Sequence, residues 1–223
     1  MSRLIVAADV STVAAAEDLA RQLAGTVGMV KVGLELYAAE GPESVRRLRG
    51  HLPVFLDLKL HDIPTTVERA SRVVGSLGAA MITVHALGGP DMVAAAARGS
   101  SEGAVERGLE PPEVIAVTVL SSLAEAAGAS PASLAFEAIE AGARGVVCSG
   151  DHVREVREAL GEGPLIVVPG IRPTGLGPND HARVLTPGEA VERGADLLVV
   201  GRPITRAADP AAAARAITRE LEG

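Results

Sequence analysis

Hydrophobic residues along this chain gather into short runs, and longer stretches of mixed polarity separate the runs. Each run is nearly continuous and rich in Val, Ile and Leu, a pattern typical of a strand buried on both faces of a parallel sheet. Between the first two runs, apolar residues recur at helical spacing and would form one face of a helix. They are Val13, Ala16, Leu19, Ala20 and Leu23. Eight runs predict strands over residues 4–9, 29–33, 54–60, 80–85, 114–120, 145–149, 165–170 and 197–201.

Eight strands that alternate with helices predict an α/β fold of the closed (β/α)8 type, a TIM barrel. We find no linker and therefore expect a single domain over residues 1–223. An open, doubly wound sheet is the alternative. The connections 121–130 and 171–183 are longer than the others. Long loops after barrel strands lie at the face where active sites are built, so both are expected to contact a substrate.

Composition narrows the possible partners and locations. The 223 residues are 48% hydrophobic and 22% charged, which suits one well-buried core. A net charge of −7 with scattered basic residues argues against nucleic acid as a partner. The single Cys148 excludes an internal disulfide and a cysteine-based metal cluster. No run reaches the length of a membrane span and no secretory signal is found, so we expect no membrane partner and a cytoplasmic location.

The third run carries charged residues inside an otherwise apolar strand. Because residues two apart share a face, its leucines would face the outer helices, while Asp57 and Lys59 would face the barrel interior. Asp62 follows just beyond the strand, before Pro64. Buried charges are costly unless they are paired, so these residues form either a structural ion pair or a catalytic group.

Three other runs also carry polar groups near their ends, namely Asp9, Lys31 and His85. A closed barrel would deliver all of them to its C-terminal face, which favours a catalytic cluster over isolated solvated strand ends. Alternating lysines and aspartates would fix each other's ionisation and hold a charged array with little reorganisation.

The end of the eighth run predicts a phosphate site. Backbone N–H groups can approach an anion at Gly201, and Arg202 offers a forked pair of donors. The alternative is an ordinary glycine turn with a surface arginine. The histidines and carboxylates lack metal-ligand spacing, and no glycine-rich nucleotide loop is present. We therefore expect neither a metal nor a cofactor.

The motif Asp57-x-Lys59-x-x-Asp62, continued by Ile-Pro-x-Thr66, resembles the signature of the orotidine 5′-phosphate decarboxylases. The resemblance extends over nearly the whole chain, and its order and spacing match the shorter, bacterial-type enzymes. Further matching motifs are Ala8-Asp9, Lys31-Val-Gly-x-Glu35, His85-Ala-x-Gly-Gly, Val117-Thr-Val-Leu-Ser-Ser, Pro169-Gly-Ile-Arg172-Pro and Gly201-Arg202-Pro-Ile.

This resemblance implies an enzyme that decarboxylates orotidine 5′-monophosphate (OMP) to uridine 5′-monophosphate (UMP) without a cofactor, the last step of de novo pyrimidine biosynthesis. Lys59 would deliver a proton to C6 of the pyrimidine, and Asp57 would face the substrate carboxylate. Lys31 and Asp62 would complete the charged network. Substrate contacts are also implied for Asp9, Lys31, Thr66, Ser122 or its neighbour Ser121, Pro169, Arg172, Gly201 and Arg202.

One position departs from the family pattern. The family usually carries Gln in the loop after Gly-Ile-Arg-Pro, and here His181 aligns with it. Either His181 takes over the contact to the phosphate, or the alignment shifts within this glycine-rich loop.

The resemblance further implies a homodimer in which Asp62 and Thr66 complete the active site of the neighbouring chain. The alternative for Asp62 is that it caps the helix starting near Pro64 in its own chain. Two other functions stay open. Related magnesium-dependent sugar-phosphate decarboxylases and synthases share the Asp-x-Lys-x-x-Asp motif, and a barrel without catalysis could bind a uridine nucleotide.

Overall fold

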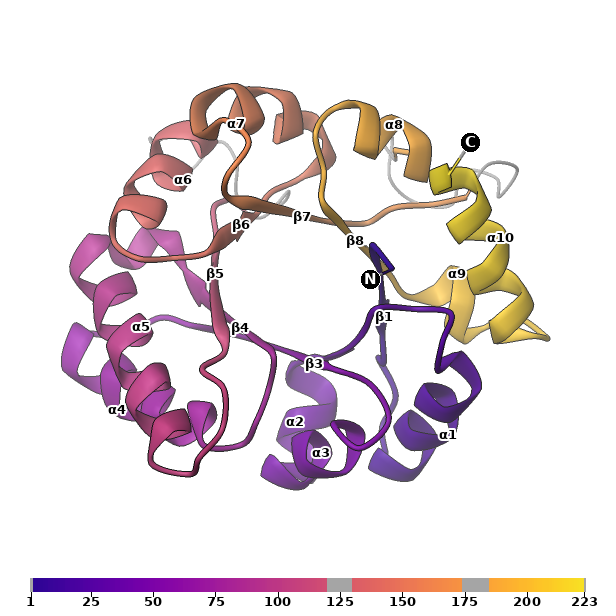
Figure 1. The fold of residues 1–223 in the computed structure, drawn as a ribbon, viewed down its shortest axis with the longest axis horizontal. Coiled ribbons are helices and arrows are strands. Elements are labelled where there is room, and N and C mark those ends of the chain that lie inside the picture. The colour runs from indigo at the N-terminus through magenta and orange to yellow at the C-terminus, as the bar shows by residue number, and fades with distance from the viewer. Residues whose placement is uncertain (1, 120–129, 174–184, 223) are drawn as a thin grey trace.

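Eight parallel strands form a closed barrel with helices around it, and each strand pairs with the next, β8 closing onto β1 (Figure 1). The computed structural model describes residues 2–119, 130–173 and 185–222. The predicted TIM barrel is therefore confirmed, and the open sheet is wrong. The strands are β1 Leu4–Ala7, β2 Met29–Val32, β3 Val54–Leu60, β4 Met81–His85, β5 Glu113–Val117, β6 Gly145–Val147, β7 Leu165–Pro169 and β8 Leu197–Val200.

Helices follow the strands on the outside of the barrel (Figure 1). Those in the described residues are α1 Val13–Leu23, α2 Leu34–Glu40, α3 Pro42–Leu48, α4 Pro64–Gly75, η1 Ala86–Gly88, α5 Pro90–Val105, α6 Pro131–Glu140, η2 Gly150–His152, α7 Val153–Leu160, α8 Pro187–Glu192, α9 Arg202–Thr205 and α10 Pro210–Glu222. Helix α1 buries the five apolar residues predicted for its inner face, and Thr12 caps its first turn by accepting from the N–H of Ala15.

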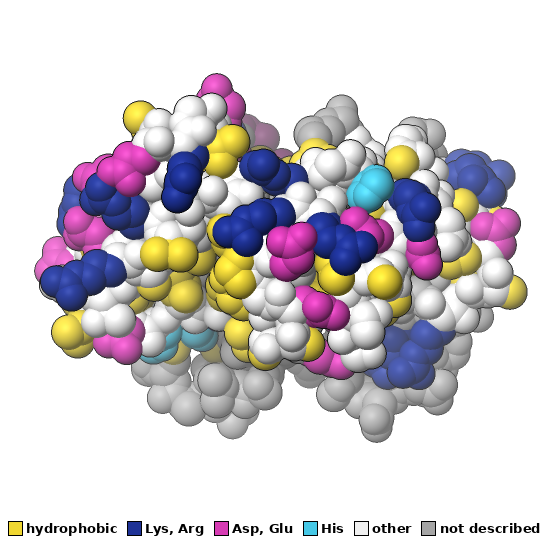
Figure 2. Space-filling view, turned by 90° about the horizontal axis from the view of Figure 1, so that it is seen from below, with side chains coloured by type: hydrophobic (Ala, Val, Ile, Leu, Met, Phe, Trp, Pro, Cys, Tyr) yellow, Lys and Arg dark blue, Asp and Glu magenta, His cyan; other side chains and the backbone are white. Residues whose placement is uncertain are grey.

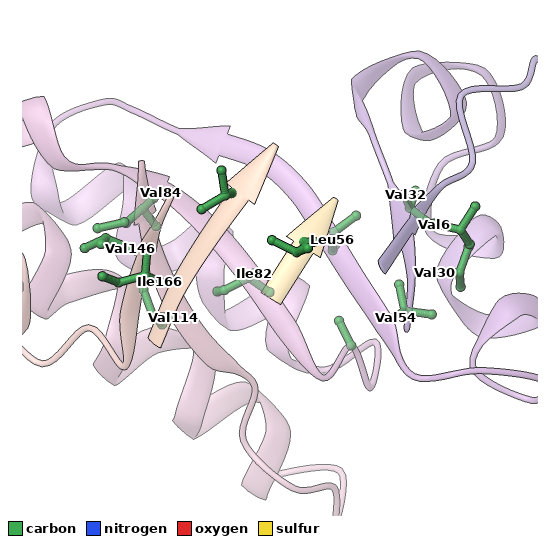
Figure 3. Packing of buried hydrophobic residues seen from close by; sticks show 14 of the residues in the cluster. Val6, Val30, Val32, Val54, Leu56, Ile82, Val84, Val114, Val146 and Ile166 are labelled. Carbon is green, nitrogen blue, oxygen red and sulfur yellow. The ribbon is translucent and has the colours of Figure 1, made fainter. Parts of the chain in front are cut away.

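The alternation of side chains along each strand divides the core into two layers. Side chains at one parity pack against the helices, as Val6, Val30 and Leu56 do in Figure 3. Side chains at the other parity fill the inside of the barrel, where Phe55 and Met81 are almost completely buried. Because Asp57, Lys59 and Thr83 share the parity of that inner layer, they stand above an apolar floor.

Helices α4 and α5 pack unusually close together. A Cβ added at Gly75, Gly99 or Gly103 would collide with a backbone carbonyl of the other helix. Ion pairs border the contact on the surface, where Arg72 pairs with Glu102 and Glu106. On the face drawn in Figure 2, Lys and Arg side chains alternate with Asp and Glu side chains.

Candidate active site

The end of β3 departs from regular strand geometry. Lys59 has φ of 52°, the only positive φ of a non-glycine residue in the described part of the chain. The pairing of β3 with β4 shifts between Leu56 and Leu60, so this stretch bulges out of the ladder. A left-handed lysine costs about 1–3 kcal/mol and persists only where its surroundings hold it, which is common at functional sites.

Four charged side chains in or just after β1, β2 and β3 form a chain of alternating sign. The Nζ atom of Lys59 lies 2.8 Å from Oδ1 of Asp57, and Nζ of Lys31 lies 3.7 Å from Oδ2 of the same carboxylate. Lys31 also lies 3.3 Å from Oδ1 of Asp9. The side chains of Lys31 and Asp57 are only 12% and 14% exposed, so each needs the opposite charges beside it. The arrangement presents two fixed ammonium groups at the barrel mouth.

Two residues of β4, Thr83 and His85, lie beside the charged chain. Thr83 is fully buried, and its hydroxyl donates to Oδ1 of Asp57 at 3.0 Å while accepting from the backbone N–H of Lys59 at 2.8 Å. His85 packs its ring 5.1 Å from the ring of His61. Burial lowers the pKa of His85 below its ordinary value, and the charges of His61 and Lys59 add to the effect.

These contacts of β4 are hard to predict from residue types. Thr83 stands inside an apolar run. Alternation along the strand could have indicated the position of Thr83, because Thr83 lies two residues before His85 and therefore shares its interior face.

Asp62 and Thr66 lie beyond the end of β3, Asp62 in the loop before α4 and Thr66 in the first turn of that helix. Both are exposed, and Oδ1 of Asp62 accepts from the N–H of Ile63 at 2.7 Å. Helix α4 has Ile63 as its N-cap, without a side-chain capping bond. Asp62 is therefore not the N-cap of α4. Among the described residues, no ion pair or hydrogen bond joins Asp62 or Thr66 to Lys59.

The predicted phosphate-binding residues stand at the ends of neighbouring strands. Gly201 follows β8, and a Cβ placed on it would lie 3.6 Å from Oδ2 of Asp9, so the ends of β1 and β8 meet here. Arg202 is exposed at the first position of α9. Pro169 ends β7 and is exposed, and the backbone N–H of Arg172 donates to the carbonyl of Leu185 at 3.1 Å. Ser121, Ser122 and His181 lie outside the described residues.

Other features of the described residues bear on function. Burial raises the pKa of the Cys148 thiol to about 12, as expected for an unreactive core cysteine. Within the described ranges, no group of three or more His, Cys, Asp or Glu side chains is arranged to hold a metal ion. None of the described helices is both long and apolar enough to cross a membrane.

Comparison with known proteins identifies the family. Residues 2–217 match the model of the "Orotidine 5'-phosphate decarboxylase / HUMPS family". The chain is 54% identical over 209 residues to an orotidine 5'-phosphate decarboxylase of Anaeromyxobacter sp. (strain K), covering 89% of this chain and 88% of the relative. It is 48% identical to that of Thermobifida fusca, covering 88% and 86%. The crystal structure of orotidine 5'-phosphate decarboxylase from Lactobacillus acidophilus superposes with a TM-score of 0.85 at 36% identity, over 100% of both chains. This chain therefore belongs to the orotidine 5'-phosphate decarboxylase / HUMPS family.

Proposed function

We propose that this protein converts OMP to UMP and carbon dioxide without a cofactor, as the last step of de novo pyrimidine biosynthesis in the cytoplasm. The observation that carries the proposal is the alternating chain Asp9, Lys31, Asp57 and Lys59 at the barrel mouth. Decarboxylation leaves an electron pair on C6 of the pyrimidine, and with no cofactor to absorb it, fixed cations of the protein must stabilise that charge.

The geometry supports a division of labour among these residues. As the bond between C6 and the carboxylate breaks, the Lys59 ammonium stabilises the electron pair left on C6 and transfers a proton to it. Asp57, 2.8 Å from that ammonium, orients it and faces the substrate carboxylate. Because Lys31 pairs with the other oxygen of Asp57, the array stays aligned while the substrate charge changes.

Binding energy comes from parts of the substrate that do not react. Asp9 and Lys31 are assigned to the ribose hydroxyls, and Gly201 with Arg202 to the phosphate. Gly201 lies beside Asp9, so the ribose and phosphate contacts are adjacent, as they are in a nucleotide. Ser122 is assigned to the pyrimidine edge, and Pro169, Arg172 and His181 to the segment that closes over the phosphate. Closure of that segment would use phosphate binding energy to desolvate the reacting carboxylate.

The proposed working unit is a homodimer in which Asp62 and Thr66 complete the partner's site. Large hydrophobic side chains are exposed after three neighbouring strands. Leu34 follows β2, Ile63 follows β3 and Leu87 follows β4, and they are 58%, 66% and 38% exposed. An apolar rim beside the site supports a second copy docking there and bringing its own Asp62 loop.

A magnesium-dependent sugar-phosphate enzyme is the second candidate. In such an enzyme the carboxylates would have to bind the metal. Here Asp57 already accepts hydrogen bonds from Lys59 and Thr83 and forms an ion pair with Lys31. A metal ion would have to displace these lysines, so the contacts favour the nucleotide enzyme.

An absorbance assay with OMP, run with and without a chelator, tests the proposal. We expect turnover to UMP that the chelator leaves unchanged. Loss of activity with chelator would point to the metal-dependent relatives, and tight binding of UMP without any turnover of OMP would point to a barrel that only binds nucleotides.

A further inference from the structure

We infer that Thr83 is a positioning residue that holds Lys59 in its reactive orientation; this rests on the proposed role of Lys59. The buried hydroxyl of Thr83 contacts both Lys59 and Asp57. It accepts from the backbone N–H of Lys59 and donates to the carboxylate of Asp57. The Thr83 side chain therefore fixes the main chain of Lys59 and the side chain of Asp57.

The bulge in β3 explains why a hydroxyl is required at this place. Leu56 pairs with Ile82 and Leu60 pairs with Val84, so four residue steps on β3 face two steps on β4. Residues within such a bulge lose their regular ladder partners. The Oγ1 atom of Thr83 lies 2.8 Å from the N–H of Lys59 and serves it in place of a strand carbonyl.

The same bond keeps Lys59 in its left-handed conformation. With φ of 52°, Lys59 needs contacts that compensate for the unfavourable backbone, because extended backbone is the ordinary choice for a strand lysine. The conformation leaves the Lys59 ammonium on Oδ1 of Asp57, the oxygen that also receives the hydroxyl of Thr83. Without the hydroxyl, neither the backbone nor the carboxylate is held from the β4 side.

The variant Thr83→Val tests the positioning role directly, because it keeps the shape of the side chain and removes both hydrogen bonds. We expect kcat to fall about 10- to 100-fold, the effect of losing one hydrogen bond to a charged group. KM and the affinity for UMP should change less than threefold, because the proposed phosphate and ribose contacts are untouched. Thr83→Ser retains the hydroxyl and should restore most of kcat.

Thr118→Val is the matched control. Thr118 is also a fully buried threonine after a neighbouring strand, but its hydroxyl donates to the carbonyl of Val147 at 3.1 Å. It should lose stability without the selective loss of kcat. If Thr83→Val folds poorly, Thr83→Ala gives a second variant without the hydroxyl.

Several results would overturn the inference. They are a Thr83→Val enzyme with wild-type kcat, a Thr83→Ser enzyme as slow as Thr83→Val, or an equal loss of kcat in Thr118→Val. A crystal structure of Thr83→Val gives a readout without turnover, and an unchanged Lys59 backbone with its ion pair to Asp57 would also overturn it. Wild-type protein that fails to decarboxylate OMP would instead contradict the proposed function, while that crystal structure would still test the positioning role.

Discussion

Lys59 combines an unfavourable backbone conformation with an ion pair to a mostly buried carboxylate. Replacing it with alanine should lower kcat by at least about 10³-fold, because one change removes both the proton donor and the nearest cation. The protein should still fold, since Asp57 keeps Lys31 as a partner at 3.7 Å. Steady-state turnover of OMP, with a thermal melt to monitor folding, measures both. A variant that keeps wild-type turnover would refute the proposed role of Lys59.

Arg202 has a separate expected role, in affinity. Arg202→Ala should raise KM about 10- to 100-fold, the effect of a lost charge-assisted bond of about 1.5–3 kcal/mol, with a smaller fall in kcat if closure depends on the contact. Arg206, also exposed and one turn further along, provides the control, since Arg206→Ala makes the same charge change. An unchanged KM in Arg202→Ala, or equal effects in both variants, would remove Arg202 from the phosphate site.

Much of the site could be predicted from spacing alone. Period two placed Asp57 and Lys59 inside the barrel, and the structure confirms this placement, with Leu56 packed on the outer side. The apolar runs located all eight strands, although several end one to three residues earlier than expected. Two of the residues beyond the observed strands, Asp9 and Gly201, lie at the candidate site.

The remaining features depend on a break in regularity. A period-two analysis assumes an evenly paired strand, so it predicts neither the positive φ of Lys59 nor the shift against β4. That bulge brings Thr83 into contact with Lys59, and no residue type in the run around Thr83 predicts this contact. The alternative role of Asp62, capping of α4, is wrong, because the helix begins one residue later than a capping aspartate requires.

The contact between α4 and α5 gives a prediction at the level of whole elements. A Cβ at Gly103 would collide with the carbonyl of Arg72, so Gly103→Ala must push the helices apart. We expect a net loss of about 1–3 kcal/mol in the free energy of unfolding, even though alanine has the higher helix propensity by about 1 kcal/mol. A thermal or denaturant melt measures this loss.

Gly163→Ala is the control, since an added Cβ there meets nothing within 4 Å. It should leave the melting midpoint nearly unchanged. If Gly103→Ala were as stable as the wild type, the close packing of these helices would not be a constraint on the fold.

At the scale of the whole molecule, the Asp62 loop makes no ion pair with the charged chain among the described residues. Asp62 and Thr66 are exposed, and Ile63 between them is 66% exposed. A loop that carries polar groups beside a large apolar side chain is suited to insertion into a second copy. In a two-fold dimer the same patch lies on both chains, so each loop would serve the other's pocket.

Mixing two inactive variants tests whether the sites are shared. In a dimer of one Lys59→Ala chain and one Asp62→Ala chain, shared sites would place both lesions in one pocket and leave the other intact. Random mixing should therefore restore about a quarter of wild-type activity, since half of the dimers are mixed and each has one intact site. Asp62→Ala mixed with Thr66→Ala is the control, because each pocket then receives one damaged loop and no activity returns. Stable mixed dimers of the first pair without recovery would rule out shared sites, and so would a fully active monomer, because in both cases each chain would have to supply every catalytic group itself.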